Sequence, residues 1–372
     1  MSIHRTSEGT WRVKYRENGR QRSKNFPTKA LATRFDAEVK ERKIEGRPMR
    51  RLKDAPTIEE FAVNWLAERD DLAPNTWNDY ASALEKHVIP YIGHLRVHAS
   101  EIRPIVLSDW MQDRLKAGAG KESIRKAQVA LSQILDLAVL PHELLEMNPM
   151  APVKKPKQKR KQPRYLTAVE VEKIKLAFHE NDDIESAVLV SVLGYVGIRP
   201  QDALALDWQH VGGKLSVVVK NVDGEIHDGS KTGPNKYLRR VELPEPVRNE
   251  LEELRYQSGS PTVGPIFTAD GMSTWNEGRY RNWRRRKFSP AAKAAGLGNL
   301  TPYALRHTCA SLMAAAGRNH LEIAYQLGHS PETSVRLYQH LIDAGTGPRR
   351  PVDEWITDAQ REVSGSEIAR AS

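Results

Sequence analysis

Residues 301–338 read TPYALRHTCASLMAAAGRNHLEIAYQLGHSPETSVRLY, a pattern that predicts three short helices. The first opens at Thr301-Pro302 and ends at Gly317, and the second ends at Gly328-His329. The third begins after Ser330-Pro331, because proline is favoured at the first helical position. Each of these segments carries one chemically distinctive side chain among apolar neighbours. We therefore expect a common site for Arg306, His329 and Tyr338.

Another arginine follows a strongly apolar helix upstream. That helix runs through Val188 and Leu193 into the segment Gly197-Ile198-Arg199-Pro200-Gln201-Asp202. An arginine directly after so buried a run needs an anionic partner, because an unpaired charge is costly to bury. A structural salt bridge to Asp202, three positions on, is the simplest explanation of Arg199.

Strand-like segments at 215–220 and 237–243 flank Gly229-Ser230-Lys231-Thr232-Gly233. Residues 224–232 nearly imitate the phosphate-binding loop of nucleotide-binding proteins. The lysine lies one place late, however, and strand-like residues follow where that motif requires a helix. We therefore exclude a nucleotide site and predict a β-hairpin that carries Lys231.

The order of these elements resembles the tyrosine recombinases, the phage-integrase family. The resemblance rests on Arg306-His307-Thr308, on Leu327-Gly328-His329 with a tyrosine nine residues after the histidine, and on the upstream arginine segment. A Lys-Thr pair before the Arg-x-Val-x-Leu strand at 239–243 adds to it, and the likeness covers nearly the whole chain. It implies an enzyme that cuts and rejoins DNA through a 3′-phosphotyrosyl link.

The resemblance also implies roles for the matching residues. Tyr338 is the implied nucleophile, since a tyrosine oxygen can store the phosphate as an ester. Arg199 and Arg306 are implied to hold the scissile phosphate. Lys231 is implied as the general acid, with Lys236 as the second choice because hairpin length varies. The remaining implied members are His329, as a further phosphate donor, and Asp202, as the support of the first arginine. This set requires no cofactor, metal or nucleotide.

One position departs from the family pattern. Three residues before the second arginine the family usually has histidine, and here Tyr303 occupies that place. With an unperturbed pKa of roughly 10, tyrosine cannot serve as an ordinary base near pH 7. A phenol can still donate to a phosphate oxygen or accept from Tyr338, so Tyr303 stays in the predicted catalytic set. His307 lies one helical step of about 100° from Arg306, which predicts a structural hydrogen bond rather than a substitute base.

Composition indicates the class of partner. The chain has 372 residues, which predicts two or three domains. Lys and Arg number 57 against 47 Asp and Glu, and the net charge of +10 suits a polyanion. Cys309 is the only cysteine, which excludes a disulfide scaffold and a cysteine-rich zinc site. No apolar run approaches the roughly 20 residues of a membrane span. We expect no membrane partner and a soluble, cytoplasmic, nucleoid-associated protein in a bacterial host.

Residues 3–26 predict a small β-sheet, and a helix follows from Thr28. Apolar residues from Trp11 to Tyr15 alternate with basic ones, and Asn18-Gly19 is a hairpin turn signal. A three-residue loop would put all the strand charges on one face, whereas a two-residue loop would pair Trp11 with Phe26 and split them. The arrangement resembles the arm-site-binding domain of integrases. It implies DNA contacts from Arg12, Lys14, Arg16, Arg22 and Lys24.

The next segment, 55–151, predicts an all-helical domain that opens at a capping box on Thr57. Its position and helix count resemble the core-binding domain of the family. Its plausible phosphate contacts are Lys86, Arg114, Lys121, Arg125 and Lys126, of which Lys121 and Arg125 are the predicted DNA-binding residues. Residues 152–164 are dense in Lys, Arg and Pro, which predicts a basic interdomain linker.

The predicted catalytic domain spans residues 165–344. Its sequence RYRNWRRRK at 279–287 has a charge density that indicates phosphate contact, and the predicted DNA-binding residues there are Arg281, Arg284 and Arg285. The tail at 345–372 is mostly polar. In related recombinases such tails dock on a neighbouring protomer, so we expect either that or disorder.

The expected fold is therefore multidomain α+β. A three-stranded sheet with a helix at 1–50 is followed by the all-α core-binding domain and a mainly α catalytic domain with a small β-sheet. The expected function is integration of a phage or other mobile element, and excision with a partner. A resolvase or invertase of the same family is one alternative, and a catalytically inactive DNA-binding regulator is the other. The expected partners are double-stranded DNA with core and arm sites, further copies of the chain in a tetramer, and a directionality factor or DNA-bending protein.

Overall fold

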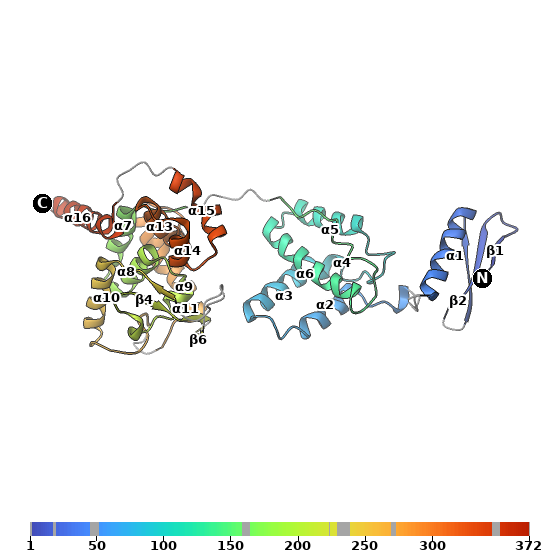
Figure 1. Ribbon diagram of the computed structural model, residues 1–372, viewed down its shortest axis with the longest axis horizontal. Helices are drawn as coiled ribbons and strands as arrows, with labels where there is room; N and C mark the ends of the chain where they lie inside the picture. The colour runs from blue at the N-terminus through green and yellow to red at the C-terminus, as the bar shows by residue number, and fades with distance from the viewer. Residues whose placement is uncertain are drawn as a thin grey trace. The chain divides into compact units, whose positions relative to one another are not determined.

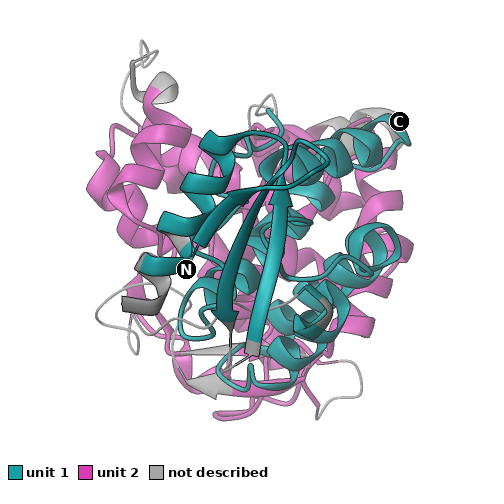
Figure 2. Ribbon diagram, turned by 90° about the vertical axis from the view of Figure 1, so that its right-hand side faces the viewer, with its two compact units in different colours: residues 1–160 teal, residues 161–372 magenta. Residues whose placement is uncertain are grey.

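The computed structural model describes residues 2–17, 20–44, 52–157, 164–222, 224–228, 239–268, 273–343 and 350–371. The chain divides into two compact units, residues 1–160 and 161–372, which Figure 2 distinguishes by colour. This division falls within the predicted linker at 152–164. The finer division into arm-binding, core-binding and catalytic domains stays a prediction.

Unit 1 begins with a three-stranded antiparallel sheet. Its strands, in spatial order, are β1 (Ser2–Arg5), β2 (Trp11–Glu17) and β3 (Arg20–Phe26). The register pairs Trp11 with Phe26 and Glu17 with Arg20, so the two-residue connection is the one that forms. Helix α1 (Lys29–Ile44) covers one face of this sheet (Figure 1) and buries Val13 against Phe35.

This register splits the strand charges between the two faces. Residues directly opposite each other share a face, so Arg12, Lys14 and Arg16 lie on the face away from α1. Arg22 and Lys24 lie opposite Tyr15 and Val13, on the face that α1 covers. There the Lys24 ammonium lies 5.0 Å from the ring centroid of Phe35. The five predicted DNA contacts of this sheet therefore do not share one face.

The rest of unit 1 is helical. A short 3-10 turn, η1 (Leu52–Asp54), precedes five helices: α2 (Ile58–Ala67), α3 (Pro74–His87), α4 (Ile89–Ile92), α5 (Pro104–Lys116) and α6 (Lys121–Val139). The predicted capping box starts α2, since Thr57 Oγ1 accepts from Glu60 N at 3.1 Å and Glu60 Oε2 accepts from Thr57 N at 2.8 Å. The core contains Trp65, Leu84, Trp110, Leu131 and Leu135. Val153 also packs in this core, two residues beyond the predicted end of the domain.

Unit 2 is mainly α, with two small pairs of strands. Its helices and helical turns are α7 (Ala168–His179), α8 (Ile184–Ser191), η2 (Val192–Val196), α9 (Pro200–Ala203), η3 (Trp208–His210), α10 (Glu245–Gln257), α11 (Glu277–Trp283), η4 (Arg284–Phe288), α12 (Ser289–Ala294), α13 (Pro302–Ala315), α14 (His320–Leu327), α15 (Pro331–Asp343) and α16 (Val352–Ala371). The central helix α8 is buried from Ser186 to its end and continues into the π-helical turn η2, which is buried throughout. The predicted apolar run into Arg199 is thus the middle of the core of this unit.

The strands of unit 2 form two antiparallel pairs. Strand β4 (Leu215–Val217) pairs with β7 (Arg239–Val241), and β5 (Val219–Val222) pairs with β6 (Glu225–Asp228). The single strand predicted at 215–220 is therefore divided between the two pairs. Lys231 and Lys236 lie outside the described residues.

The last helix, α16, packs against α7 and α10 of its own unit. Ile356 and Ala359 are buried in the main core, and Gln360 Nε2 donates to Glu250 Oε1 at 3.0 Å. The expectation of a disordered tail is wrong for this helix, because its apolar residues have a face to cover on the same chain. Docking on a neighbouring protomer stays a prediction. None of the helices in the described ranges combines the length and apolar character that a membrane crossing demands.

Candidate active site

The three helices predicted from residues 301–338 form at α13, α14 and α15. Asn319 caps the start of α14, where its Oδ1 accepts from Glu322 N at 3.0 Å. Gly328 ends this helix in the left-handed conformation, with φ of +67°, and Pro331 then opens α15. The turn that carries His329 is therefore short and defined at both ends.

Arg306 and Arg199 are each held by the carbonyl group of a left-handed glycine. Arg306 Nη1 donates to the Gly197 oxygen at 2.6 Å, and Arg199 Nη2 donates to the Gly328 oxygen at 2.6 Å. Gly197 has φ of +74°, where a residue with a side chain is strained. A Cβ at either glycine would also overlap neighbouring side chains. Both arginines thus depend on a backbone conformation and a close approach that favour glycine.

Asp202 is the carboxylate that these guanidinium groups share. It is 3% exposed and lies 3.8 Å from Arg199 and 3.7 Å from Arg239, which belongs to β7. Burial raises the pKa of Asp202, and the neighbouring guanidiniums oppose that shift. Burial lowers the pKa of Arg239 to about 10, so this group is still charged at neutral pH. With Arg306 nearby, three cations lie around one carboxylate, so positive charge is in surplus here among the described residues.

Tyr338, on α15, is 2% exposed. Its hydroxyl oxygen lies 2.7 Å from Nδ1 of His307, on the adjacent helix α13. Burial raises the pKa of the Tyr338 phenol, and the charge of Arg306 opposes that shift. Burial and the charge of Arg306 lower the pKa of His307 to about 4. The His307 ring is therefore neutral at pH 7, and one of its nitrogens can accept a hydrogen bond.

His329 lies on the other side of the same phenol. Its ring stacks on Tyr338 with centroids 6.1 Å apart, and its Nδ1 donates to the Ser330 carbonyl at 3.1 Å. Its Nε2 is buried and has no hydrogen-bond partner among the described residues. Burial, assisted by the nearby arginines, lowers the pKa of His329 to about 4. A bound anion acts in the opposite direction, so His329 can take up a proton and donate through Nε2 when an anion is present.

Two family models match this chain. Residues 164–344 match the model described as "Phage integrase family", and residues 57–115 match "Phage integrase, N-terminal SAM-like domain". The chain belongs to the phage integrase family of tyrosine recombinases. The first match contains every catalytic position predicted above.

Named relatives of this integrase-family chain are distant. Tyrosine recombinase XerC of Roseiflexus castenholzii is 25% identical over 209 residues, which is 53% of this chain and 62% of the relative. The integrase of Mycobacterium phage D29 is 24% identical over 324 residues, which is 84% of this chain and 80% of that one.

Two solved structures of lambda integrase are similar in fold. One is a tetramer bound to a Holliday junction, with a TM-score of 0.60 at 16% identity, and it covers 93% of this chain and 96% of that one. The other is a dimer bound to a COC' core site, with a TM-score of 0.58 at 17% identity. It covers 94% of this chain and 97% of the lambda integrase chain. At such identities the likeness shows the fold alone, and it confirms the predicted tyrosine recombinase fold.

The structure of this chain brings most of the predicted catalytic side chains to one place. The residues gathered there are Arg199, Asp202, Arg306, His329 and Tyr338. Tyr303 is 48% exposed at the edge of this group, and its ring lies against that of His307 with centroids 5.2 Å apart. Lys231 is not described, so its membership and the roles of all these residues stay predictions.

Sequence reasoning missed two members of the site. The structural hydrogen bond predicted for His307 forms, but its partner is the predicted nucleophile. One helical step does rotate His307 away from Arg306, and α15 packs on the side that it then faces. Arg239 was visible only as the first residue of the Arg-x-Val-x-Leu strand pattern. Its contact with Asp202 depends on where β7 lies in the fold.

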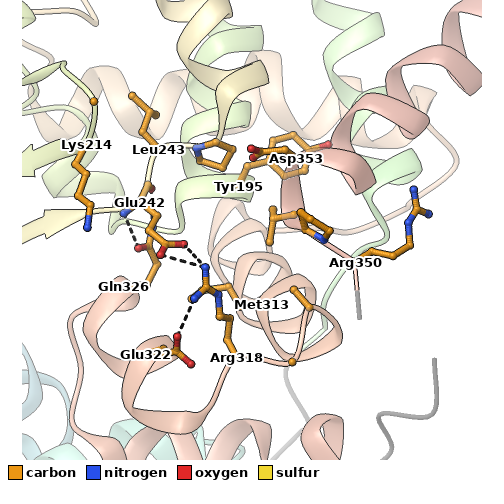
Figure 3. Close-up of a pocket in the computed structure, with 16 residues that line it drawn as sticks. Tyr195, Lys214, Glu242, Leu243, Met313, Arg318, Glu322, Gln326, Arg350 and Asp353 are labelled. Carbon is orange, nitrogen blue, oxygen red and sulfur yellow. Dashed lines mark hydrogen bonds and ion pairs between the residues drawn. The ribbon is translucent and has the colours of Figure 1, made fainter. Parts of the chain in front are cut away.

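A pocket of about 630 Å³ opens on unit 2 among the end of α13, the residues after β7, α14 and the start of α16 (Figure 3). Arg318 pairs there with Glu242 at 3.1 Å and with Glu322 at 2.8 Å. Gln326 accepts from Glu242 N at 2.9 Å and donates to the carbonyl at the end of η2 at 3.0 Å. None of the predicted catalytic residues that the structure describes lines this pocket. Its contacts fix α14, whose C-terminal end carries part of the active site.

The predicted DNA-binding residues of the helical regions lie at the surface. Lys121, Arg284 and Arg285 are exposed, and Arg125 is half-buried. Arg281 is exposed and pairs with Glu277 at 3.0 Å. DNA contact by these residues stays a prediction. The described part of the chain contains no group of three or more His, Cys, Asp or Glu side chains that could hold a metal ion.

Proposed function

We propose that this chain is a site-specific DNA recombinase that cleaves and rejoins double-stranded DNA through a 3′-phosphotyrosyl link to Tyr338. The observation that carries the proposal is the surplus of buried positive charge beside a buried tyrosine. Arg199 and Arg239 lie within ion-pair distance of the Asp202 carboxylate, and the charge of Arg306 also acts on it. A buried charge surplus is costly until an anion compensates it. A DNA phosphodiester is an anion that a tyrosine can attack.

Each side chain then has a defined task. Arg199 and Arg306 bind the non-bridging oxygens of the scissile phosphate and stabilise the charge that develops during attack. Tyr338 forms the covalent bond to phosphorus. His329 Nε2 donates to a phosphate oxygen once that oxygen has raised its pKa. Asp202 holds Arg199 in place, at 3.8 Å.

The leaving 5′ oxygen needs a proton, and we assign Lys231 as its donor on the family resemblance. Lys231→Ala is expected to slow cleavage of a normal phosphodiester by about 100-fold to 10,000-fold. On a 5′-bridging phosphorothiolate the variant should lose much less of the wild-type rate, because sulfur leaves without a proton. Rates on both substrates, measured in single turnover, check this. The absence of selective rescue by sulfur would move the role to Lys236.

The biological reaction that we propose is integration of a phage or other mobile element, with excision directed by a partner. The similarity to a phage integrase over 84% of this chain and the N-terminal sheet support it. A resolvase or invertase of the same family is the alternative, and the similarity to a protein named tyrosine recombinase, XerC, leaves that alternative open. A tetramer on DNA is proposed from the lambda integrase tetramer. Sequencing the junctions of recombined DNA would separate integration from resolution and would also give the core site.

The direct test uses a suicide duplex of that core site, nicked beside the cleavage point so that rejoining cannot occur. The expected product is a covalent protein–DNA adduct on Tyr338, located by peptide mass spectrometry. A protein that binds the duplex without forming an adduct would be a DNA-binding regulator instead. An adduct on another residue would reject the assigned nucleophile.

A further inference from the structure

We propose that His307 is the general base that accepts the phenolic proton of Tyr338 during strand cleavage. The inference rests on the proposed function, because it names the residue that activates the nucleophile of that reaction. His307 contacts the reacting atom itself, since its Nδ1 lies 2.7 Å from the Tyr338 hydroxyl oxygen. That is hydrogen-bond distance, which a general base must have.

The direction of this hydrogen bond follows from the surroundings of the phenol. Tyr338 is 2% exposed, so its hydroxyl hydrogen needs an acceptor within the protein. Among the described residues His307 Nδ1 is the hydrogen-bond partner of this hydroxyl. The neutral ring, with its pKa lowered to about 4, has one nitrogen that can accept. The phenol therefore donates and Nδ1 accepts, which puts the proton on the path to the base.

The other side chains near the phenol are less suited to take this proton. His329 stacks on the ring, and its Nδ1 donates to the Ser330 carbonyl. Arg306 is a cation and cannot accept a hydrogen bond. Tyr303, at the position where the family usually has histidine, is 48% exposed and is itself a phenol. Its ring rests against His307 and covers one side of the proposed base, with centroids 5.2 Å apart.

The step balances as a concerted transfer. The Tyr338 oxygen bonds to phosphorus as the bond from phosphorus to the 5′ oxygen breaks, and the phenolic proton moves to His307 Nδ1. The 5′ oxygen takes its proton from the general acid. A ring with so low a pKa cannot deprotonate a resting phenol, but the phenol becomes acidic as its oxygen bonds to phosphorus. The phosphate charge also favours the imidazolium that forms. In rejoining, the imidazolium returns the proton to Tyr338.

The decisive variant is His307→Asn. The asparagine amide can accept the hydrogen bond at nearly the same place but cannot take up a proton. Single-turnover cleavage of the suicide duplex is expected to slow by about 100-fold to 10,000-fold, with core-site binding within a few-fold of wild type. His320→Asn is the matched control, because His320 also bonds to α15, at 3.2 Å to Ser334 and 2.7 Å to Gln339. The His320→Asn variant is expected to cleave the suicide duplex at a rate within a few-fold of the wild-type rate.

A second measurement keeps the proposal testable if His307→Asn binds DNA poorly. His307→Ala leaves a half-buried space beside the phenol, and added imidazole should restore cleavage at a rate that increases with the pKa of the imidazole derivative used. Failure of every imidazole to restore cleavage would overturn the base role. Cleavage by His307→Asn within about 10-fold of wild type would also overturn it, because a hydrogen bond without proton transfer would then suffice. Absence of an adduct with the wild-type protein would reject the proposed function instead.

Discussion

The chemistry proposed for this chain depends on one oxygen atom and on the groups that surround it. In the proposed reaction Tyr338 supplies the oxygen, and burial favours the protonated form of its phenol. The arginines supply charge and remain cationic throughout. A substitution that removes only the phenolic oxygen should therefore abolish formation of the covalent bond to phosphorus without abolishing DNA binding.

Tyr338→Phe removes the attacking oxygen and keeps the ring that packs against Leu327 and Met313. Core-site binding is expected within a few-fold of wild type, with no covalent adduct. Gel shift and denaturing electrophoresis of the suicide duplex measure the two properties. Tyr325→Phe is the control, because Tyr325 is 58% exposed on α14 and should still allow the adduct. An adduct that persists in Tyr338→Phe but not in Tyr325→Phe would reverse the assignment.

Tyr303 allows an independent check of which group takes the proton. If His307 is the base, Tyr303→His adds a second imidazole where none is needed, and the cleavage rate should stay within a few-fold of wild type. Tyr303→Phe keeps the ring contact with His307 and should cost less than about 10-fold, far below the usual loss of a base. Single-turnover rates of both variants decide this. A gain of 100-fold in Tyr303→His would mean that the base position was vacant.

Secondary-structure elements position these groups through their ends. The carbonyl at the C-terminal end of α14 holds Arg199, and the carbonyl after η2 holds Arg306. Gln326 connects α14 to the residue that follows β7. A displacement of α14 would therefore move both Arg199 and His329.

Gly328→Ala tests this dependence. The left-handed backbone costs a residue with a Cβ about 1–2 kcal/mol, and the new Cβ would also displace the Arg239 guanidinium. A displacement of about 1 Å at a catalytic group can cost about 100-fold, so cleavage should slow by at least that factor. Gly296→Ala is the matched control, with φ of +77° and nothing within 4 Å of its Cβ. Equal cleavage rates for the two variants would show that crowding at Gly328 is unimportant.

At the scale of the whole molecule, the proposed DNA contacts extend from unit 2 to the sheet of unit 1. The sheet of unit 1 carries Arg12, Lys14 and Arg16 on the face away from α1. Phosphate contacts made by such a face are independent of sequence and weaken with salt. The proposed arm-site contact should therefore depend on this face and leave cleavage at the core site intact.

Lys14→Ala with Arg16→Ala removes two exposed cations from that face. Binding to DNA that flanks the core site should weaken, with the slope of log affinity against log salt smaller by about 2, while suicide cleavage is unchanged. The control is Arg34→Ala with Lys40→Ala, which removes two exposed cations from α1. Titrations at several salt concentrations measure the slopes. Equal losses for the two pairs would argue that total charge, and not this face, binds the flanking DNA.

The sequence by itself determined the helices of residues 301–338, because glycine and proline end and begin helices through local backbone sterics. It also predicted the capping box at Thr57 and the two arginine segments, and the order of the motifs was enough to suggest the family. Each of these features depends on residues only a few positions apart, so it can be predicted from the sequence alone.

The tertiary structure decided what distant residues do to one another. The pairing of Trp11 with Phe26 placed Arg22 on the covered face of the sheet, a choice that alternation alone left open. The packing of α15 against α13 brought Tyr338 to His307, although the two are 31 positions apart. The place of β7 brought Arg239 to Asp202. Such contacts follow from how apolar faces pack together, and no local sequence pattern specifies which two faces will meet.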